Sequence, residues 1–304
     1  MITLPFTKMV GTGNDFIVVD ASRNRLRPLK GRWKIASRGL CDRHNGIGAD
    51  GLLVLEPSKV AHVKMRVFNP DGSEAQMCGN GARCVALYLQ ATSNQRPATR
   101  RKRVTIETTA GVLSGLVRGN RVAMRMTDPT HVQIERSLEV NRRRLRVGFL
   151  DTGVPHVVVP VADLDAVNVA TLGRAVRYHG AFAPQGTNVD FVQADSANEN
   201  RLRVRTYERG VEAETQACGT GIVASALFHA LRRELASGQS GPSPTKPRRR
   251  FWRLNVQARS GERLRVSCAI ARDARGLRVS DVTLEGAAQR IFEGTVEWPM
   301  GRGK

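Results

Sequence analysis

The sequence predicts an α+β protein made of two similar halves. Its 304 residues are enough for two domains with buried cores. Strand-like segments of alternating hydrophobicity are short, and few helical segments lie between them, which favours α+β over a doubly wound α/β fold. A Cys-Gly-x-Gly sequence starts at Cys78 and again at Cys218, 140 residues later. That separation indicates an internal duplication, because solenoid repeats have periods of about 20–50 residues.

The expected elements follow the hydrophobic periodicity of the chain. The expected strands are 16–20, 51–55, 65–69, 104–108, 121–126, 156–161, 188–192, 204–208, 253–258, 264–268 and 294–298. The expected helices are 34–41, the two segments that follow the Cys-Gly-x-Gly turns, and 164–178. We place the domain boundary near Asp128-Pro129. Residues 1–128 then form the N-terminal half and 129–288 the C-terminal half, and the last strand, within 289–304, is expected to return to the first half.

The duplication extends upstream of each cysteine. Strand 65–69 precedes the first cysteine and strand 204–208 the second, and each alternates in hydrophobicity and ends in a polar residue. A third similarity joins residues 13–18 to residues 188–192. Three matching segments in each half predict two similar domains that face each other.

The charge of the chain raises the possibility of a nucleic-acid partner. Lys and Arg together number 48, of which 40 are Arg, against 27 Asp and Glu, so the formal net charge is +21. Arginine runs at 100–103, 142–146 and 248–250 could bind a polyanion or could be solvated loops. Aromatic residues are only 5%, none of the runs is interleaved with them, and no known nucleic-acid-binding motif is present. We therefore do not expect a nucleic-acid partner.

Other classes are excluded by composition. No apolar stretch approaches the roughly 18 residues that span a bilayer, and the N-terminus lacks the pattern of a secretory signal, so we expect a cytoplasmic protein with no membrane partner. The five Cys are odd in number and show no Cys-x-x-Cys spacing, which argues against a disulfide framework and a metal site. Cys41, Cys84 and Cys268 are expected to be small buried side chains.

Cys78 and Cys218 are different, because each stands at the start of an expected Ala/Leu-rich helix. The free N–H groups of a helix N-terminus favour a thiolate and can bind a carboxylate. Two facing copies would place one Cys on each side of a bound carbon, so that one thiolate removes a proton while the opposite thiol delivers one. The sequence contains no glycine-rich phosphate-binding pattern and no recognisable pyridoxal-binding lysine, so we expect no cofactor.

These residues resemble the diaminopimelate epimerase family across nearly the whole chain. The matching segments are FTKMVGTGNDF (6–16), DRHNGIGAD (42–50), FNPDGSEAQMCGNGARC (68–84), DTGVPH (151–156), GTNVDF (186–191), RTYERG (205–210) and ACGTG (217–221). The resemblance implies a cofactor-independent epimerase that converts LL- into meso-diaminopimelate in lysine and peptidoglycan-precursor synthesis. It also implies a homodimer whose two pseudo-symmetric domains, each a β-barrel-like mixed sheet around a central helix, close over the substrate.

The resemblance also implies roles for individual residues. Cys78 and Cys218 would be the catalytic acid–base pair. The backbone N–H groups that bind the reacting carboxylate would come from Gly79, Asn80, Gly219 and Thr220. The distal end of the substrate would be held by Asn14, Asn69, Asn188 and Arg209. Glu208 would contact substrate amino groups and, together with His156, modulate the two thiols.

Simpler interpretations remain open for these positions. The three Asn could cap turns, Glu208 and Arg209 could form an exposed ion pair, and His156 could be structural. We expect Asp15 and Asp190 to serve turns or backbone hydrogen bonds rather than catalysis.

The chain also departs from the family pattern. Val154 stands where many members carry Asn and Gly51 where some carry Gln. Segment 211–215 is one residue longer than usual, and 237–250 is an insertion.

Three alternatives to an epimerase of this family remain. They are a proline racemase-like enzyme, which also pairs two cysteines, a phenazine-type isomerase, which lacks the pair, and a basic nucleic-acid-binding module.

Overall fold

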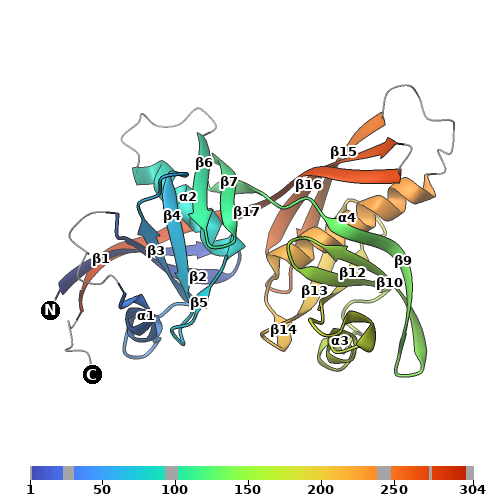
Figure 1. The fold of residues 1–304 in the computed structure, drawn as a ribbon, viewed down its shortest axis with the longest axis horizontal. Helices are drawn as coiled ribbons and strands as arrows, with labels where there is room; N and C mark the ends of the chain where they lie inside the picture. The colour runs from blue at the N-terminus through green and yellow to red at the C-terminus, as the bar shows by residue number, and fades with distance from the viewer. Residues whose placement is uncertain (1, 23–30, 93–101, 238–247, 274–275, 299–304) are drawn as a thin grey trace. The chain divides into compact units, whose positions relative to one another are not determined.

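The computed structural model describes residues 2–22, 31–92, 102–237, 248–273 and 276–298 (Figure 1). The chain divides into two compact units. The first is Met1–Met124 with Gly286–Lys304, and the second is Arg125–Glu285. The divisions therefore fall at 124/125 and 285/286, where the sequence suggested 128/129 and 288/289.

The strands of the first unit close on themselves. The ring consists of β1 (Ile2–Gly11), β2 (Asn14–Asp20), β3 (Gly51–Glu56), β4 (Val63–Phe68), β6 (Lys102–Thr108), β7 (Gly111–Arg118), β8 (Arg121–Arg125) and the C-terminal part of β17 (Gly276–Trp298). Each strand pairs with the next, and β17 pairs with both β1 and β8. The short β5 (Glu74–Ala75) adds to β4. This closure makes the unit a β-barrel.

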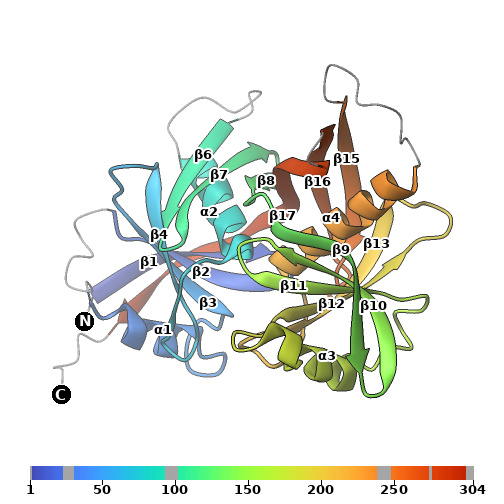
Figure 2. The same cartoon turned by 45° about the vertical axis from the view of Figure 1, so that its right-hand side comes forward.

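Two helices complete the first unit. Helix α2 (Gly79–Thr92) contacts β1, β2, β4, β6 and β7, so it lies within the curve of the barrel (Figure 2). Its Ala, Cys and Val side chains from 82 to 86 are fully buried there. Helix α1 (Trp33–Cys41) packs on β3 and β4 from outside, because Trp33, Ala36 and Leu40 share one face at helical spacing.

The second unit has the same arrangement. Its strands pair in the order β9 (Thr130–Val140), β10 (Arg143–Asp151), β11 (Pro155–Pro160), β12 (Asn188–Ala194), β13 (Arg201–Glu208), β15 (Arg248–Gln257), β16 (Arg263–Asp273) and the N-terminal part of β17. The Met126 N–H bonds to the Val282 carbonyl at 2.9 Å, which ties the chain entering β9 back to β17. The short β14 (Ala213–Thr215) adds to β13.

The central helix of the second unit is α4 (Gly219–Ala236). It buries Ile222, Val223 and Leu227 against Leu254 and Leu264 of the surrounding strands. Helix α3 (Val169–Arg177) and the short 3-10 turn η2 (Gly180–Phe182) pack on the outer face of the sheet. The predicted α+β class, with a barrel-like sheet around a central helix in each half, is confirmed.

The order of parallel pairs reveals which strands of the two units correspond. In the first unit β2 runs parallel to β3 and β4 to β6; in the second β11 runs parallel to β12 and β13 to β15. Strand β12 is therefore the counterpart of β3. The predicted match of residues 13–18 with 188–192 is wrong, since it joins β2 to β12 and so pairs strands at different places in the fold.

Two expected elements differ in extent from the observed ones. The helix predicted for 164–178 begins only at Val169, because the Asn168 side chain caps it by accepting the Thr171 N–H at 3.0 Å. The strand predicted for 294–298 is the end of β17, which is 23 residues long and supplies both units. None of the helices described is long and apolar enough to cross a membrane.

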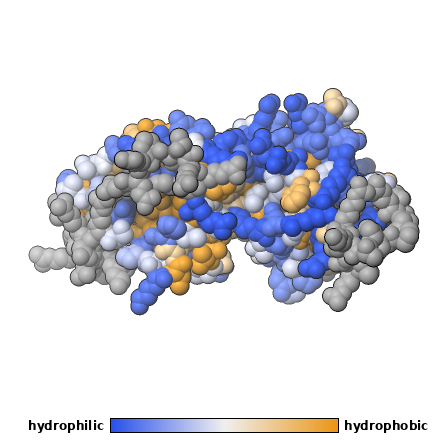
Figure 3. Space-filling view, turned by 90° about the horizontal axis from the view of Figure 1, so that it is seen from above, coloured by the Kyte–Doolittle hydropathy of each residue, from blue (hydrophilic) through white to orange (hydrophobic). Residues whose placement is uncertain are grey.

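The arginine runs are partly engaged by nearby carboxylates. Arg250 lies 3.5 Å from Glu234, and Arg249 pairs with Asp281. The arginines from 142 to 146 are exposed on and just before β10, whereas Arg100 and Arg101 lie outside the described residues. Much of the surface seen in Figure 3 is hydrophilic. Two of these arginines are thus paired with carboxylates, and those from 142 to 146 are exposed to solvent.

Candidate active site

The predicted catalytic cysteine of the first unit lies at the start of α2. Cys78 is half-buried directly before the helix, and its sulfur accepts a hydrogen bond from the Gly81 N–H at 3.3 Å. The Ala82 N–H bonds to the Cys78 carbonyl at 2.8 Å and opens the helical pattern. The N–H groups of this first turn and the positive end of the helix dipole favour an anion beside the thiol.

A series of hydrogen-bonded side chains, two of them amides, surrounds this turn. The Asn80 Nδ2 donates to Asn14 Oδ1 at 2.6 Å, and the Asn14 Nδ2 donates to Asp50 Oδ2 at 3.0 Å. The fully buried Arg83 donates to Asn80 Oδ1 and, at 2.5 Å, to Thr12 Oγ1. The structure therefore brings the predicted residues Asn14 and Asn80 together and fixes the orientation of both amides.

This series of hydrogen bonds ends at Asp50, which belongs to a cluster of charged side chains around Asp15. Its carboxylate lies 2.7 Å from both Lys8 Nζ and Arg43 Nη2, and Arg43 also reaches Asp50 at 2.7 Å. Burial alone would raise the pKa of Asp15, but hydrogen bonds from Arg43 and Lys8 outweigh it and hold the pKa well below its usual range. Asp15 also accepts the Asp50 N–H at 3.1 Å, which is the backbone role expected of it.

Asn69 has a local partner. It follows β4 in an exposed turn, where its Nδ2 donates to Ser73 Oγ at 2.8 Å and its N–H to the Ser73 carbonyl at 2.8 Å. These contacts agree with the simpler interpretation of Asn69 as a turn residue, and its substrate contact stays a prediction.

The predicted catalytic cysteine of the second unit lies at the start of α4. Cys218 has 7% of its surface exposed, its Sγ lies 3.5 Å from the Thr220 hydroxyl, and its carbonyl accepts the Ile222 N–H at 2.9 Å. Burial raises the pKa of the Cys218 thiol well above its usual range, and the nearby carboxylates of Glu208 and Asp190 raise it further. The protonated thiol is therefore favoured at this position.

Glu208 ends β13 close to Cys218. Burial raises the pKa of the Glu208 carboxyl, the Thr215 side chain opposes this shift, and the charge of Asp190 adds to it. Asp190 also bonds to His156, so the two predicted modulating residues, His156 and Glu208, lie around one buried carboxylate.

His156 belongs to a buried polar group that sequence reasoning missed. Its Nδ1 lies 2.7 Å from Asp190 Oδ2, and the Thr206 hydroxyl donates to Asp190 Oδ1 at 2.7 Å. His156 and Asp190 have no exposed side-chain surface. The prediction that Asp190 serves a turn or a backbone bond is wrong, because residue 190 faces inward from β12 and binds two side chains beneath α4.

Asn188 and Arg209 meet at the end of β13. The Asn188 Nδ2 donates to the Pro155 carbonyl at 3.2 Å, and its Oδ1 accepts the Arg209 N–H at 2.8 Å. Arg209 is half-buried as a residue, and its guanidinium donates to the Gln185 carbonyl at 3.4 Å. Asn188 therefore ties β11 to the strand that carries Glu208.

The two departures that concern substrate contacts have local explanations. Val154 is half-buried in the turn between β10 and β11, where its carbonyl accepts the Thr152 N–H at 3.1 Å. Gly51 is buried, and a Cβ there would lie 3.3 Å from the Phe68 carbonyl and 3.4 Å from the Phe16 ring. A Cβ at 51 would therefore be tight against the Phe68 carbonyl and in ordinary contact with the Phe16 ring.

The two longer segments are only partly described. Segment 211–215 enters β14, and Glu212 within it has φ of 57° and pairs with Arg177 at 2.9 Å. Most of the insertion 237–250 lies outside the described residues, since 238–247 are not among them.

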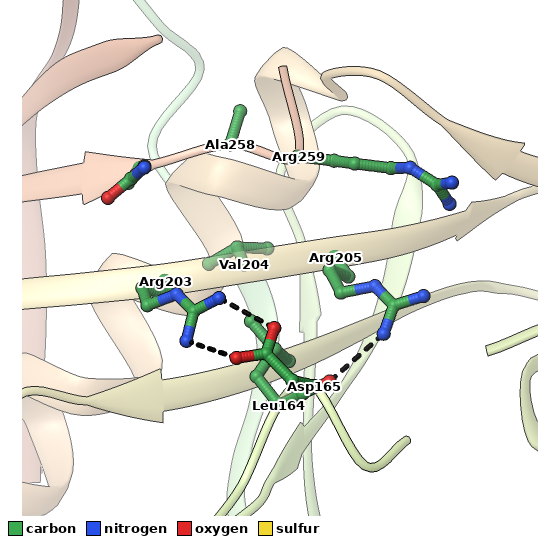
Figure 4. Close-up of a pocket in the computed structure, with 8 residues that line it drawn as sticks. Leu164, Asp165, Arg203, Val204, Arg205, Ala258 and Arg259 are labelled. Carbon is green, nitrogen blue, oxygen red and sulfur yellow. Dashed lines mark hydrogen bonds and ion pairs between the residues drawn. The ribbon is translucent and has the colours of Figure 1, made fainter. Parts of the chain in front are cut away.

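A separate cavity of about 270 Å³ lies in the second unit (Figure 4). Arg203 pairs there with Asp165 at 2.7 Å, while Arg205 donates to the Leu164 carbonyl at 3.0 Å and to Glu214 at 2.6 Å. Its guanidinium groups are thus engaged in structural bonds. None of the predicted site residues lines this cavity.

The remaining cysteines are structural. Cys41, Cys84 and Cys268 are buried and unbridged, as predicted. Burial raises the pKa of Cys41 to about 11 and that of Cys268 to about 12, which makes both thiols unreactive. In the described part of the chain, no group of three His, Cys, Asp or Glu side chains is placed to hold a metal ion.

Comparison with known proteins agrees with these observations. A model of the family described as diaminopimelate epimerase matches residues 6–132 and 148–241. The chain belongs to the diaminopimelate epimerase family. It is 39% identical over 299 residues to the diaminopimelate epimerase of Aquifex aeolicus, covering 96% of this chain and 97% of that one. The diaminopimelate epimerase of Pelotomaculum thermopropionicum is 42% identical over 243 residues, covering 74% and 83% of the two chains.

Solved structures share the fold of this family at low identity. A phenazine biosynthesis protein of the PhzF family from Bacillus anthracis matches with a TM-score of 0.63 at 19% identity, covering 98% of this chain and 100% of that one. A probable proline racemase from Agrobacterium radiobacter gives 0.63 at 16%, covering 97% and 93%. The predicted fold and the predicted family of this protein are both confirmed.

Proposed function

We propose that this protein epimerises LL-2,6-diaminopimelate to meso-diaminopimelate without a cofactor, in lysine and peptidoglycan-precursor biosynthesis. Family membership and the names of its relatives support an isomerase of the epimerase class. The observation that carries the proposal is the topological equivalence of α2 and α4, each of which starts directly after a cysteine. An inversion needs one acid and one base, and the duplicated turn supplies two groups of the same chemistry.

The reaction is a proton transfer on each face of the α-carbon. One thiolate removes the α-proton, and the electron pair of the broken C–H bond is held on the α-carbon and its carboxylate. The opposite thiol then donates its proton to the other face. The two sulfurs exchange protonation states, so the step consumes no external acid or base.

The first turns of the two helices would stabilise the charge that develops. The backbone N–H groups of Gly79, Asn80, Gly219 and Thr220 would bind the reacting carboxylate, as at other helix N-termini. The raised pKa of Cys218 favours its protonated form, which is the form that an acid needs before it can deliver a proton.

The rest of the predicted set would recognise the distal end of the substrate. Arg209 would bind the distal carboxylate through two guanidinium N–H groups, and Glu208 would contact amino groups. The amides of Asn14, Asn69 and Asn188 would supply the remaining polar contacts. We expect the arginine-rich surface to speed the encounter with this anionic substrate rather than to bind nucleic acid.

Proton exchange in D₂O tests the two-base assignment. The enzyme is incubated with LL-diaminopimelate without pyridoxal phosphate, and deuterium at the α-carbon is followed by mass spectrometry. Cys78→Ala and Cys218→Ala should each lower the rate of epimerisation by about 10³-fold or more. Cys84→Ala and Cys268→Ala are matched controls, one buried cysteine in each unit, and should epimerise at the wild-type rate.

Two outcomes would contradict the proposal. Epimerisation at the wild-type rate in both Cys78→Ala and Cys218→Ala would exclude the two-base mechanism. Racemisation of proline, with no action on diaminopimelate, would instead favour the proline racemase-like alternative.

A cytoplasmic homodimer is also part of the proposal. Sedimentation of the purified protein tests its oligomeric state.

A further inference from the structure

The two candidate half-sites differ beneath their helix starts. In the parallel pairs of strands, Phe16 lies opposite Gly51 in the first unit and His156 opposite Asn188 in the second. The position two residues along the second strand is then Leu53 in one unit and Asp190 in the other. An apolar pair, Phe16 and Leu53, thus corresponds to the buried pair of His156 and Asp190.

Close packing of the helices supports this correspondence. A Cβ at Gly81, the third residue of α2, would touch the Leu53 side chain. A Cβ at Gly221, the third residue of α4, would overlap the Asp190 carboxylate. Both glycines therefore let the first turn of a central helix rest directly on the equivalent strand residue.

A buried carboxylate requires compensating hydrogen bonds, because removing its charge from water costs several kcal/mol. Asp190 has one for each oxygen, from Thr206 Oγ1 and from His156 Nδ1, both at 2.7 Å. A carboxylate can only accept, so the His156 Nδ1 carries the proton of that bond.

The other nitrogen of this imidazole is free to act. His156 Nε2 is buried and has no hydrogen-bond partner among the described residues. A proton on this nitrogen would be buried without an acceptor, which favours the neutral ring with Nε2 as an open acceptor. The imidazole therefore has one nitrogen anchored and one available.

Contacts connect this pair to the catalytic cysteine. The Gly221 backbone lies close enough to the Cys218 sulfur to lower the pKa of the thiol, and a Cβ at Gly221 would overlap the Asp190 carboxylate. The charge of Asp190 also acts directly on the Cys218 thiol. Loss or displacement of Asp190 would therefore affect the Cys218 sulfur in two ways, through the position of Gly221 and through the charge next to the thiol.

We propose that Asp190 is a positioning residue for Cys218 and His156, fixing the imidazole with Nε2 as acceptor and supporting the first turn of α4. This role rests on the proposed function of Cys218 as an acid–base group. It makes the two half-sites chemically unequal: the second has a buried carboxylate–imidazole pair where the first has apolar side chains.

Asp190→Asn tests the proposal with little change of volume. In the wild-type protein the His156 Hδ1 proton, shared with a carboxylate, should resonate far downfield in the proton NMR spectrum; His156→Phe identifies the signal. Asp190→Asn should move it upfield, because the charge-assisted bond is lost, and should lower kcat about 100-fold with a smaller change in KM. Asp165→Asn, an exposed carboxylate of the same unit, is the matched control and should change neither.

The outcomes distinguish this proposal from its alternatives. An unchanged Hδ1 signal in Asp190→Asn, or an unchanged kcat, would overturn it. If Asp190→Asn does not fold, Thr206→Val removes one of the two anchors of Asp190, and a folded variant with wild-type kcat would overturn the role equally. A wild-type enzyme inactive on diaminopimelate would refute the proposed function. The positioning role of Asp190 would still be tested by the Hδ1 signal and by the alkylation rate of Cys218, each compared between wild type and Asp190→Asn.

Discussion

Gly221 of α4 lies so close to Asp190 of β12 that a Cβ at position 221 would overlap the carboxylate. Asp190 cannot move aside, because Thr206 and His156 hold both of its oxygens at 2.7 Å. The second glycine of the Cys218 turn is therefore required by a buried polar contact and not only by the backbone of the turn.

Gly221→Ala should destabilise the protein by about 2 kcal/mol, as expected for overpacking in a core, and lower kcat by displacing the turn beside Cys218. Gly219→Ala is the control, because its Cβ would meet the Leu284 side chain at an ordinary 3.4 Å. Urea unfolding compares the two variants. Equal stabilities would show that the Asp190 contact is not tight.

Asp15→Asn should cost about 2 kcal/mol at neutral pH, because Lys8 and Arg43 lose their charged partner. The folded pKa of Asp15 lies below its ordinary value of 3.8. The stabilising contribution is thus present above pH 4 and lost as pH falls through the folded pKa. Urea unfolding from pH 7 to pH 2.5 should show wild type and variant converging in acid, and a constant difference would argue against the ion pairs.

The Cys218 thiol should be alkylated by iodoacetamide only at high pH, because its pKa is raised from 9.0 by burial and by Glu208 and Asp190. Glu208→Gln removes one of these charges and should increase the alkylation rate at pH 8, measured by peptide mass spectrometry. Glu199→Gln, an exposed carboxylate, is the control and should leave the rate unchanged. A rate that does not respond to Glu208→Gln would mean that the charge of Glu208 does not raise the pKa of the Cys218 thiol.

Asn188→Asp should lower kcat/KM about tenfold and the melting temperature with it. An Asp can still accept the Arg209 N–H, but it cannot donate to the Pro155 carbonyl, so two acceptors would face each other. Asn198→Asp introduces the same charge at an exposed turn, and we expect wild-type kinetics from it. Unchanged kinetics in both would assign Asn188 no part in holding β11 and β13.

Trp298→Ala should destabilise the first unit by about 2 kcal/mol, less than for a fully buried Trp, because this ring is half-buried. The ring covers Gly39 of α1, where a Cβ would overlap it. Ile291→Ala, at an exposed position of the same strand, should cost little. Equal melting temperatures for the two variants in thermal unfolding would argue against a structural role for the end of β17.

Local pattern accounts for the elements that the sequence predicted well. The central helices are recognisable because glycine turns precede Ala/Leu-rich segments, and the strands before the cysteines alternate clearly in hydrophobicity. Strands β1, β7, β9 and β10 were not among the expected elements. Most of β9 is exposed, and β10 begins with exposed residues, so these strands show little of the hydrophobic alternation by which a strand is recognised in sequence.

The sequence by itself determined the family, the α+β class, the duplication and the two cysteines, because each of these is written in short segments of neighbouring residues. Tertiary structure alone decided that β12 corresponds to β3, that Asn14 bonds to Asn80, and that Asp190 supports His156. These contacts join residues 34 to 66 positions apart. Strand pairing and inward-facing side chains create them, and no local pattern of residues records either.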